Sequence, residues 1–180
     1  MLYEEVVLLV SHINFLTHGL RKVFTEREVK KRSRMLERCA EYHSHIIRIA
    51  LEVNELHKSI TGHMVLAWAV SIGCIINQFM SMYKPAGAIL YLSGYMMSLS
   101  CFVVSGQLLQ SQSESIADEL YCIPWYLGTI EEQKTVMFMI MRAQIPLTLS
   151  AKPFGNYEYT LYVTVVKTAY SYATMLQNKT

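Results

Sequence analysis

The sequence has little charge, and the scarcity is concentrated in one long stretch. Only 17% of the 180 residues are charged, the mean hydropathy is +0.23, and Lys84 is the one charged residue within residues 60–113. Lys84 and Pro85 divide this stretch into residues 61–83 and 86–113. Each piece exceeds the roughly 20 apolar residues that a helix needs to cross a bilayer. The pattern predicts a helical hairpin through a membrane; the alternative, two buried helices of a soluble domain, is less favoured because so short a chain could hardly cover them.

Catalytic and metal-binding motifs are also lacking. The sequence contains no GxSxG, HExxH, Walker or dinucleotide-binding pattern, and its four cysteines form no CxxC pair. His43 and His45 lie two positions apart, and such residues point to different faces of a helix, so they cannot share a metal ion there. We therefore expect no enzyme activity, no cofactor and no metal site, and we expect the cysteines to be reduced.

Positive charge, scarce elsewhere, gathers near the N-terminus. Eight of the 16 basic residues fall in one short segment: Arg21, Lys22, Arg27, Lys30, Lys31, Arg32, Arg34 and Arg38. By the positive-inside rule, this segment is predicted to be cytoplasmic. Nucleic-acid binding is a weaker alternative, because no interleaved aromatic residues or recognition motif accompany the cluster.

Helical patterns occupy the rest of the chain. Val6–Leu20 is free of Asp, Glu, Lys and Arg but short, and it is either the cytoplasmic end of a transmembrane helix or a buried helix of a soluble cap. Leu36–His57 has apolar positions every three or four residues, which indicates an amphipathic helix. Thr129–Glu132 forms a capping box before a helix that is expected to end near Gln144. Pro153–Asn156 is a turn signal.

The segment Tyr159–Gln177 is predicted to be the final transmembrane helix. It is only moderately apolar, is rich in Thr, Ser and Tyr, and contains one charged residue, Lys167. A lysine within a membrane helix normally faces protein or water. The segment therefore resembles a pore-lining or bundle-interior helix; the alternative is an ordinary span whose lysine reaches out to the membrane surface.

Several motifs, most of them in the C-terminal half, carry a resemblance to a known family. In order, they are Glu41-x-His43, Ile116-Ala117-x-x-x-Tyr121-x-x-x-Trp125-Tyr126, Met141-Arg142-Ala143-Gln144-Ile145-Pro146-Leu147 and Lys167-Thr168-Ala169-Tyr170-Ser171-Tyr172. With the apolar spans between them, this ordered set resembles the C-terminal half of an insect odorant receptor. The resemblance covers most of residues 36–180.

The resemblance implies an all-α fold, part of a polytopic seven-transmembrane bundle with a cytosolic helical anchor region. Receptors of this family have a cytosolic N-terminus and an extracellular C-terminus in the plasma membrane. With a shared odorant co-receptor they form hetero-oligomers, expected to be tetrameric, that act as odorant-gated non-selective cation channels in olfactory sensory neurons. The partners implied are therefore the co-receptor, membrane lipid and, for a full-length receptor, a volatile odorant, with no nucleic acid and no cofactor.

The same resemblance divides the chain into five segments. They are 1–20, the end of a truncated transmembrane helix; 21–60, a cytosolic basic loop and amphipathic helix; 61–109, a two-span hairpin; 110–152, cytosolic anchor helices; and 153–180, the pore-lining helix.

Individual site residues are carried over from the family's motifs. The subunit-anchor residues are Trp125, Tyr126, Arg142, Gln144 and Pro146. The pore and gate residues are Lys167, Tyr170, Ser171, Tyr172 and Met175. For the odorant pocket, the resemblance suggests Tyr91 and Tyr95.

One departure from the family concerns length. The first three helices and most of the fourth are not in this sequence, so we expect a receptor fragment that lacks most of the odorant pocket. The alternative function is a small three-span interaction or structural subunit, or a decayed receptor fragment, that does not sense a ligand.

Overall fold

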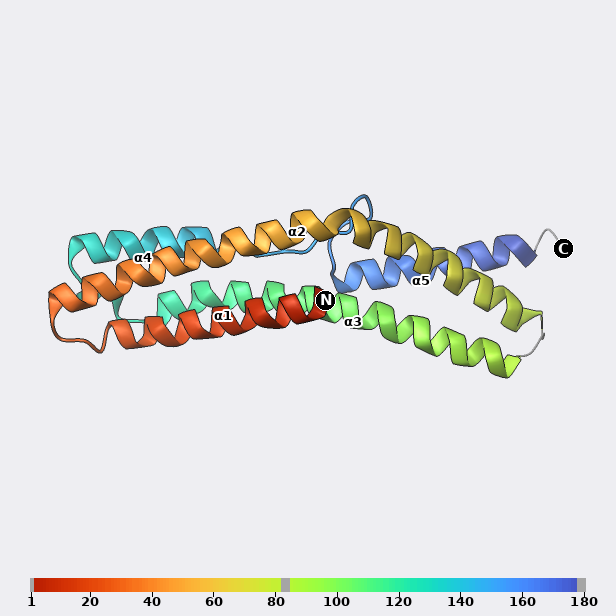
Figure 1. The fold of residues 1–180 in the computed structure, drawn as a ribbon, viewed down its shortest axis with the longest axis horizontal. Coiled ribbons are helices and arrows are strands. Elements are labelled where there is room, and N and C mark those ends of the chain that lie inside the picture. The colour runs from red at the N-terminus through yellow and green to blue at the C-terminus, as the bar shows by residue number, and fades with distance from the viewer. Residues whose placement is uncertain (1, 82–84, 178–180) are drawn as a thin grey trace. The chain divides into compact units, whose positions relative to one another are not determined.

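The computed structural model describes residues 2–81 and 85–177, and helices make up most of it (Figure 1). In chain order, the elements are α1 (Leu2–Val23), α2 (Val29–Met80), α3 (Pro85–Cys122), the 3-10 helix η1 (Trp125–Leu127), α4 (Ile130–Ala143) and α5 (Tyr159–Gln177). A single β-bridge joins Ser150 and Asn156 within these ranges. The all-helical fold class that the sequence predicts is confirmed.

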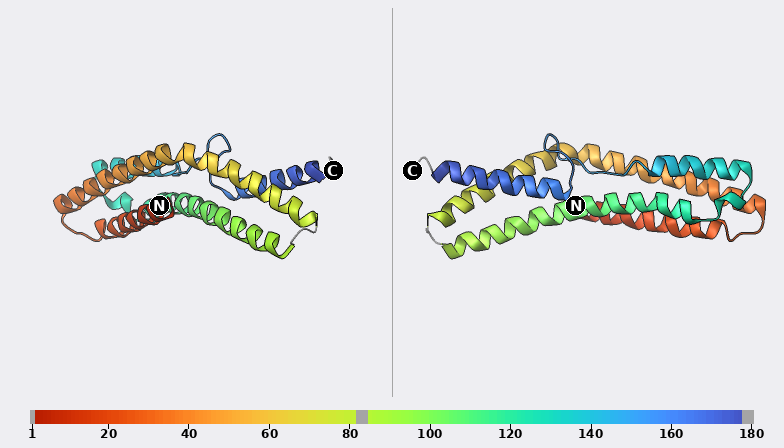
Figure 2. Two further views of the ribbon diagram at one scale, coloured as in Figure 1. Left: turned by 45° about the vertical axis from the view of Figure 1, so that its right-hand side comes forward. Right: turned by 180° about the vertical axis from the view of Figure 1, so that it is seen from behind.

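The helices form two compact units. The first unit combines the chain up to Val53 with Leu108–Thr148, and the second combines Asn54–Gln107 with the chain from Leu149 onward. The first unit therefore contains α1, the N-terminal part of α2, the C-terminal part of α3, η1 and α4. The second contains the remaining parts of α2 and α3 together with α5, which Figure 2 shows from two further sides.

α1 packs into the first unit through one apolar stripe. Its buried residues recur every three or four positions, as expected for an amphipathic helix: Leu2, Val6, Leu9, Ile13, Leu16, Leu20 and Val23. At the end of α1, the Arg21 side chain forms an ion pair with Glu119 of α3, with an Nε–Oε2 distance of 2.8 Å. The apolar residues of Val6–Leu20 thus include the buried face of α1, and α1 extends beyond that segment at both ends.

α2 and α3 are each longer than the patterns in the sequence suggested. The amphipathic segment Leu36–His57 and the apolar segment that begins at Thr61 are parts of one unbroken helix, because residues 58–60 contain neither Pro nor Gly to interrupt it. Likewise, α3 continues through the change to polar composition at Gln110 and ends at Cys122, two residues before Pro124. The turn predicted at Lys84-Pro85 falls on residues 82–84, which lie outside the described residues.

The predicted start of α4 is confirmed. Thr129 is the N-cap, its hydroxyl accepts a hydrogen bond from the Glu132 backbone N–H (3.3 Å), and the Glu132 carboxylate accepts one from the Thr129 backbone N–H (2.8 Å). After α4 ends, the backbone N–H of Leu147 donates to the buried hydroxyl of Ser113 on α3 (2.9 Å). This contact fixes the chain just beyond Pro146, where the sequence predicts that the helix must already have stopped.

α5 has the bounds that the sequence predicts for the last helix, Tyr159–Gln177. The predicted turn at Pro153–Asn156 is also present, with Gly155 at φ 104°, a left-handed conformation that glycine adopts without strain. The second unit has its core between α2, α3 and α5, where Trp68 and Phe102 meet edge to face at a centroid distance of 5.0 Å. The core thus holds α5 along one side.

Two helices in the described part of the chain are long and apolar enough to cross a membrane. They are α2 and α3, whose most apolar 18-residue windows have mean hydropathies of 1.7 and 1.6. Only 33% and 17% of these windows are buried inside the protein, which does not fit the alternative of two core helices of a soluble domain. α5 is not among these two helices, because its threonines, tyrosines and Lys167 lower its mean hydropathy.

We predict that the core of the first unit depends on Leu36 of α2, which is 1% exposed. Leu36→Ala should lower the free energy of unfolding by about 2–5 kcal/mol, because it removes buried methyl groups and leaves a cavity. Thermal unfolding of the purified protein in detergent measures the loss. Leu51→Ala, the same change at a position of α2 that is 53% exposed, is the control and should cost less than about 1 kcal/mol. Equal losses would contradict the assignment of this core.

Candidate functional site

The residues predicted to line a pore lie mainly on one exposed face of α5. The opposite face packs into the second unit through residues that recur every four positions: Leu161, Val165, Ala169 and Ala173. Lys167, Tyr170, Ser171 and Met175 are exposed. Four of the five predicted pore residues therefore point away from the core of their own unit.

Tyr172 is the exception among the predicted pore residues. A Cβ atom placed on Gly73 of α2 would lie 2.6 Å from Cδ1 of Tyr172, so the tyrosine ring lies directly over this glycine. Tyr172 is 38% exposed, against 59% for Tyr170. The structure thus separates Tyr172, which packs on α2, from the other four.

The exposed face of α5 is notably polar. We call the exposed residues Thr160, Thr164, Lys167, Thr168 and Ser171 the polar stripe. Two of the three threonine hydroxyls of this stripe turn back onto their own helix: Thr164 donates to the carbonyl oxygen of Thr160 and Thr168 donates to that of Thr164, both at 2.8 Å. These bonds satisfy the hydroxyl protons but leave oxygen lone pairs and the Lys167 ammonium group directed away from the packed face.

A second exposed face lies on η1 and α4 in the first unit. We call its large apolar side chains the α4 surface: Tyr126, Leu127, Ile130, Met137, Phe138, Met141 and Ile145, each more than half exposed. On the surface of a soluble protein, exposed large apolar side chains are normally single and scattered, whereas these seven are grouped. The buried side of α4 consists instead of Glu132, Val136, Met139 and Ala143.

The predicted anchor residues border this surface. Trp125 and Tyr126 meet edge to face in η1 at a centroid distance of 6.4 Å. Arg142 donates to the carbonyl oxygen of Ile145 (3.3 Å) beyond the end of α4, and Gln144 is the exposed C-cap of that helix. Pro146, half-buried, precedes the contact between Leu147 and Ser113. These residues shape the ends of the α4 surface rather than its centre.

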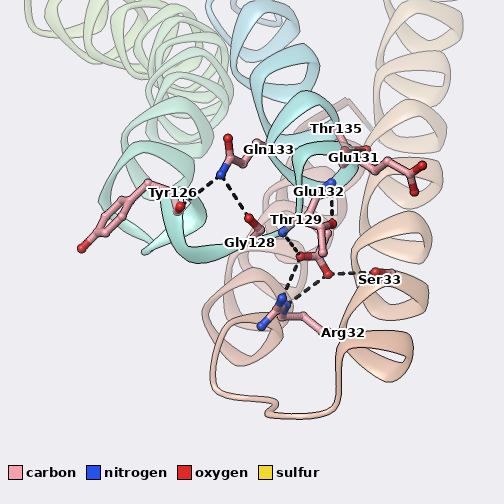
Figure 3. Close-up of polar contacts among 9 residues, drawn as sticks. All are labelled: Arg32, Ser33, Tyr126, Gly128, Thr129, Glu131, Glu132, Gln133 and Thr135. Carbon is pink, nitrogen blue, oxygen red and sulfur yellow. Dashed lines mark hydrogen bonds and ion pairs between the residues drawn. The ribbon is translucent and has the colours of Figure 1, made fainter.

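A buried ion pair, which the sequence patterns did not indicate, fastens α4 to the start of α2 (Figure 3). The Arg32 guanidinium donates to both carboxylate oxygens of Glu132, at 3.1 and 2.8 Å, and the Ser33 hydroxyl donates to the same carboxylate at 2.8 Å. Glu132 is 2% exposed. The hydrogen bonds from Arg32 lower the pKa of Glu132 to about 2, against the opposing effect of burial. Because 100 residues separate the partners, no local pattern reveals the pair.

The amide of Gln133 connects η1 to α4 next to this ion pair. It donates to the carbonyl oxygens of Tyr126 and Gly128, both at 3.0 Å (Figure 3). Glycine at position 128 lets the backbone lie close to the Glu132 side chain, because a Cβ atom there would lie 2.9 Å from the Glu132 carboxylate. The backbone of η1 at Tyr126 is thus tied to α4.

The two predicted odorant-pocket residues do lie together. They are among the residues that line an open hollow of about 250 Å³ in the second unit: Trp68, Leu90, Tyr91, Gly94, Tyr95 and Ser98. Tyr91 is 64% exposed and Tyr95 is half-buried. The hollow is aromatic on both sides, which suits a small apolar molecule.

The histidines that the sequence analysis considered as metal ligands have other surroundings. His43 is buried in the first unit, where burial and the nearby Arg142 lower its pKa to about 4, so it is neutral at physiological pH. His45 is exposed and pairs with Arg48 at 3.0 Å. Throughout the part of the chain that the structure describes, no three His, Cys, Asp or Glu side chains are grouped as metal ligands.

Comparisons with known proteins agree with the fold. A family model described as 7tm Odorant receptor matches residues 2–170. Odorant receptor 47b of Drosophila melanogaster is 27% identical over 146 residues, which make up 78% of this chain and 35% of that receptor. Odorant receptor 85c of the same species is 23% identical over 176 residues, or 93% of this chain and 44% of that receptor.

A solved structure extends the likeness to the fold. The insect olfactory receptor OR5 from Machilis hrabei, in complex with eugenol, superimposes with a TM-score of 0.79 at 15% identity, over 97% of this chain and 46% of that one. The fold and the matched model together define a helical membrane bundle. The chain belongs to the 7tm odorant receptor family, and it spans less than half the length of the relatives named above.

We predict that the Arg32–Glu132 pair stabilises the first unit at neutral pH. Glu132→Gln should lower the free energy of unfolding by roughly 3 kcal/mol, because it leaves the Arg32 charge without its partner. The folded-state pKa of Glu132 is about 2 and its ordinary value is 4.5, so the contribution is complete above pH 4.5 and is lost as the pH falls toward 2.

Thermal unfolding in detergent at a series of pH values tests both parts of this prediction. Glu131→Gln is the matched control, because Glu131 is the exposed neighbour in the same helical turn. Both variants retain His43, so the effect of its titration on stability is the same in each. The stability difference between the two variants should shrink as the pH falls below 4.5. A difference that stays constant down to pH 3 would contradict the assignment.

Proposed function

We propose that this chain supplies the channel-forming part of an odorant receptor subunit, which assembles with a co-receptor into an odorant-gated, non-selective cation channel. The observation that carries the proposal is the polar stripe on the exposed face of α5. In a membrane receptor, a face with threonines, a serine and a lysine is costly to expose to lipid. It is stable where it faces water or neighbouring subunits, and both occur around a channel.

The proposed membrane arrangement follows from charge and hydropathy. Residues 61–109 contain the two-span hairpin, and α5, within residues 153–180, forms the pore-lining helix, in the plasma membrane of an olfactory sensory neuron. The basic segment 21–60 and the anchor segment 110–152 lie in the cytosol, which puts the C-terminus outside the cell. The Arg21–Glu119 and Arg32–Glu132 pairs, both between helices of the first unit, support a common side for these two segments.

The α4 surface is proposed to be where subunits meet. Met, Tyr and Phe side chains are enriched at the centres of protein interfaces, whereas charged side chains are depleted there. The anchor residues Trp125, Tyr126, Arg142, Gln144 and Pro146 would then set the shape of the contact. The hollow beside Tyr91 and Tyr95 is proposed as the part of the odorant pocket that this chain contributes.

We predict that Met175 contributes to the gate of the channel. In the full-length receptor expressed with its co-receptor, Met175→Ser should raise the current measured without odorant at least twofold, because a hydroxyl wets an apolar constriction. The control is Met97→Ser, the same change at a position of α3 that is 69% exposed. An unchanged leak at equal surface expression would remove Met175 from the gate, and no odorant-evoked cation current in the parent receptor would refute the channel function.

We predict that Phe138 and Met141 are needed for assembly. The double change Phe138→Ser and Met141→Ser removes apolar area from the centre of the α4 surface, at positions 69% and 58% exposed. It should reduce co-purification with the co-receptor at least fivefold without lowering the unfolding temperature of the isolated subunit. Leu51→Ser, at a position of α2 that is 53% exposed, is the control. Unchanged co-purification of the double variant would exclude this surface as the interface.

A further inference from the structure

The loop that leads into α5 is fastened to α2 by hydrogen bonds. We call residues 149–157 the α5 loop. Oδ1 of Asn54 on α2 accepts two hydrogen bonds from Ser150, one from its backbone N–H (2.8 Å) and one from its hydroxyl (3.0 Å). Two helical turns further on, the buried Thr61 hydroxyl lies 3.3 Å from the carbonyl oxygen of Ser150. One loop residue is thus bound at its backbone N–H and its side chain, and its carbonyl oxygen lies beside Thr61, whose hydroxyl donates to the carbonyl oxygen of His57 at 2.7 Å.

Two glycines bring the same loop into close contact with α2 and α3. A Cβ atom on Gly62 of α2 would lie 1.9 Å from the carbonyl oxygen of Lys152. A Cβ atom on Gly106 of α3 would lie 2.4 Å from both Cβ and the carbonyl oxygen of Tyr157. Real Cβ atoms do not approach other atoms so closely, so any larger residue would push the loop away at each end.

The α5 loop is also cross-linked within itself. The backbone N–H of Ala151 donates to the carbonyl oxygen of Gly155 (2.7 Å), and that of Tyr157 donates to the carbonyl oxygen of Leu149 (2.9 Å). Tyr157 is 2% exposed, and its ring lies 6.0 Å from that of Phe102 on α3. These bonds join the two arms of the loop, and the ring contact holds its end against α3.

We propose that the α5 loop is a positioning element that couples α2 and α3 to the gate. The inference rests on the proposed function of α5 as the pore-lining helix. α5 begins at Tyr159, two residues after the Tyr157 contact, so a shift of α2 or α3 is transmitted to its first turn without slack. Asn54, Gly62 and Gly106 are the positioning residues, and none of them faces the polar stripe or the hollow beside Tyr91.

Asn54 offers a sharp test, because only its acceptor oxygen is used. Asn54→Leu removes both hydrogen bonds to Ser150 at nearly constant volume, whereas Asn54→Asp keeps an acceptor for both. In the full-length receptor with its co-receptor, Asn54→Leu should shift the odorant concentration for half-maximal current at least fivefold. It should also change the ratio of spontaneous to maximal current at matched surface expression. Asn54→Asp should stay within twofold of the parent receptor.

The glycines give an independent pair of variants. Gly62→Ala and Gly106→Ala should each shift the same two quantities, because each displaces one end of the α5 loop. Gly87→Ala on α3 is the control, since nothing lies within 4 Å of a Cβ atom added there. If the substitutions only reduce the amount of folded receptor, all currents should fall in proportion to surface expression, while the ratio of spontaneous to maximal current and the half-maximal odorant concentration stay unchanged. That outcome would overturn the inference.

A measurement without odorant separates this inference from the proposed function. Hydrogen exchange of the purified receptor in lipid nanodiscs should show protected amides at Ser150, Ala151 and Tyr157. Asn54→Leu should accelerate exchange in the α5 loop at least tenfold, and Asn54→Asp should not. Equal exchange in the two variants, or parent-like currents in Asn54→Leu, overturns the positioning role. A parent receptor without odorant-evoked current instead refutes the channel function itself.

Discussion

The packing of α5 on one side only is the constraint on which the rest of the candidate site depends. Leu161, Val165, Ala169 and Ala173 form a narrow stripe, and three of the four positions are occupied by small or β-branched residues that permit close contact. Because the stripe occupies a single face, the threonines, Ser171 and Lys167 lie on the opposite face together with exposed Val163, Tyr170 and Met175. Under the proposed function, that division turns one side of α5 toward its own unit and the other toward water or other subunits.

The same principle holds for α4 in the first unit. Its buried side combines apolar contacts with the Arg32–Glu132 ion pair, whereas its exposed side carries Phe138 and Met141. A buried ion pair adds less stability than apolar residues of equal size would, but it fixes one orientation of the helix. In this structure it determines which side of α4 is turned outward, and it therefore defines the surface proposed for assembly.

Much of the local structure could be predicted from the sequence. The capping box at Thr129 and the bounds of α5 follow from neighbouring residues, and the family membership followed from an ordered set of motifs. The continuity of α2 through residues 58–60 was missed, because a change from amphipathic to apolar composition resembles a boundary although the backbone contains no interruption. The pairing of Arg32 with Glu132 could not be predicted, because 100 residues separate them.

The sequence by itself determined that the chain is helical, membrane-embedded and related to odorant receptors, because hydropathy, periodicity and motif order are all properties of residues close together in the chain. Only the tertiary structure decided which side of each helix is free. It separated Tyr172, which lies over Gly73, from Tyr170 on the exposed face, and it brought Asn54 to Ser150 across 96 residues. Such choices depend on how helices distant in the sequence fit together, and that information is not contained in any single segment.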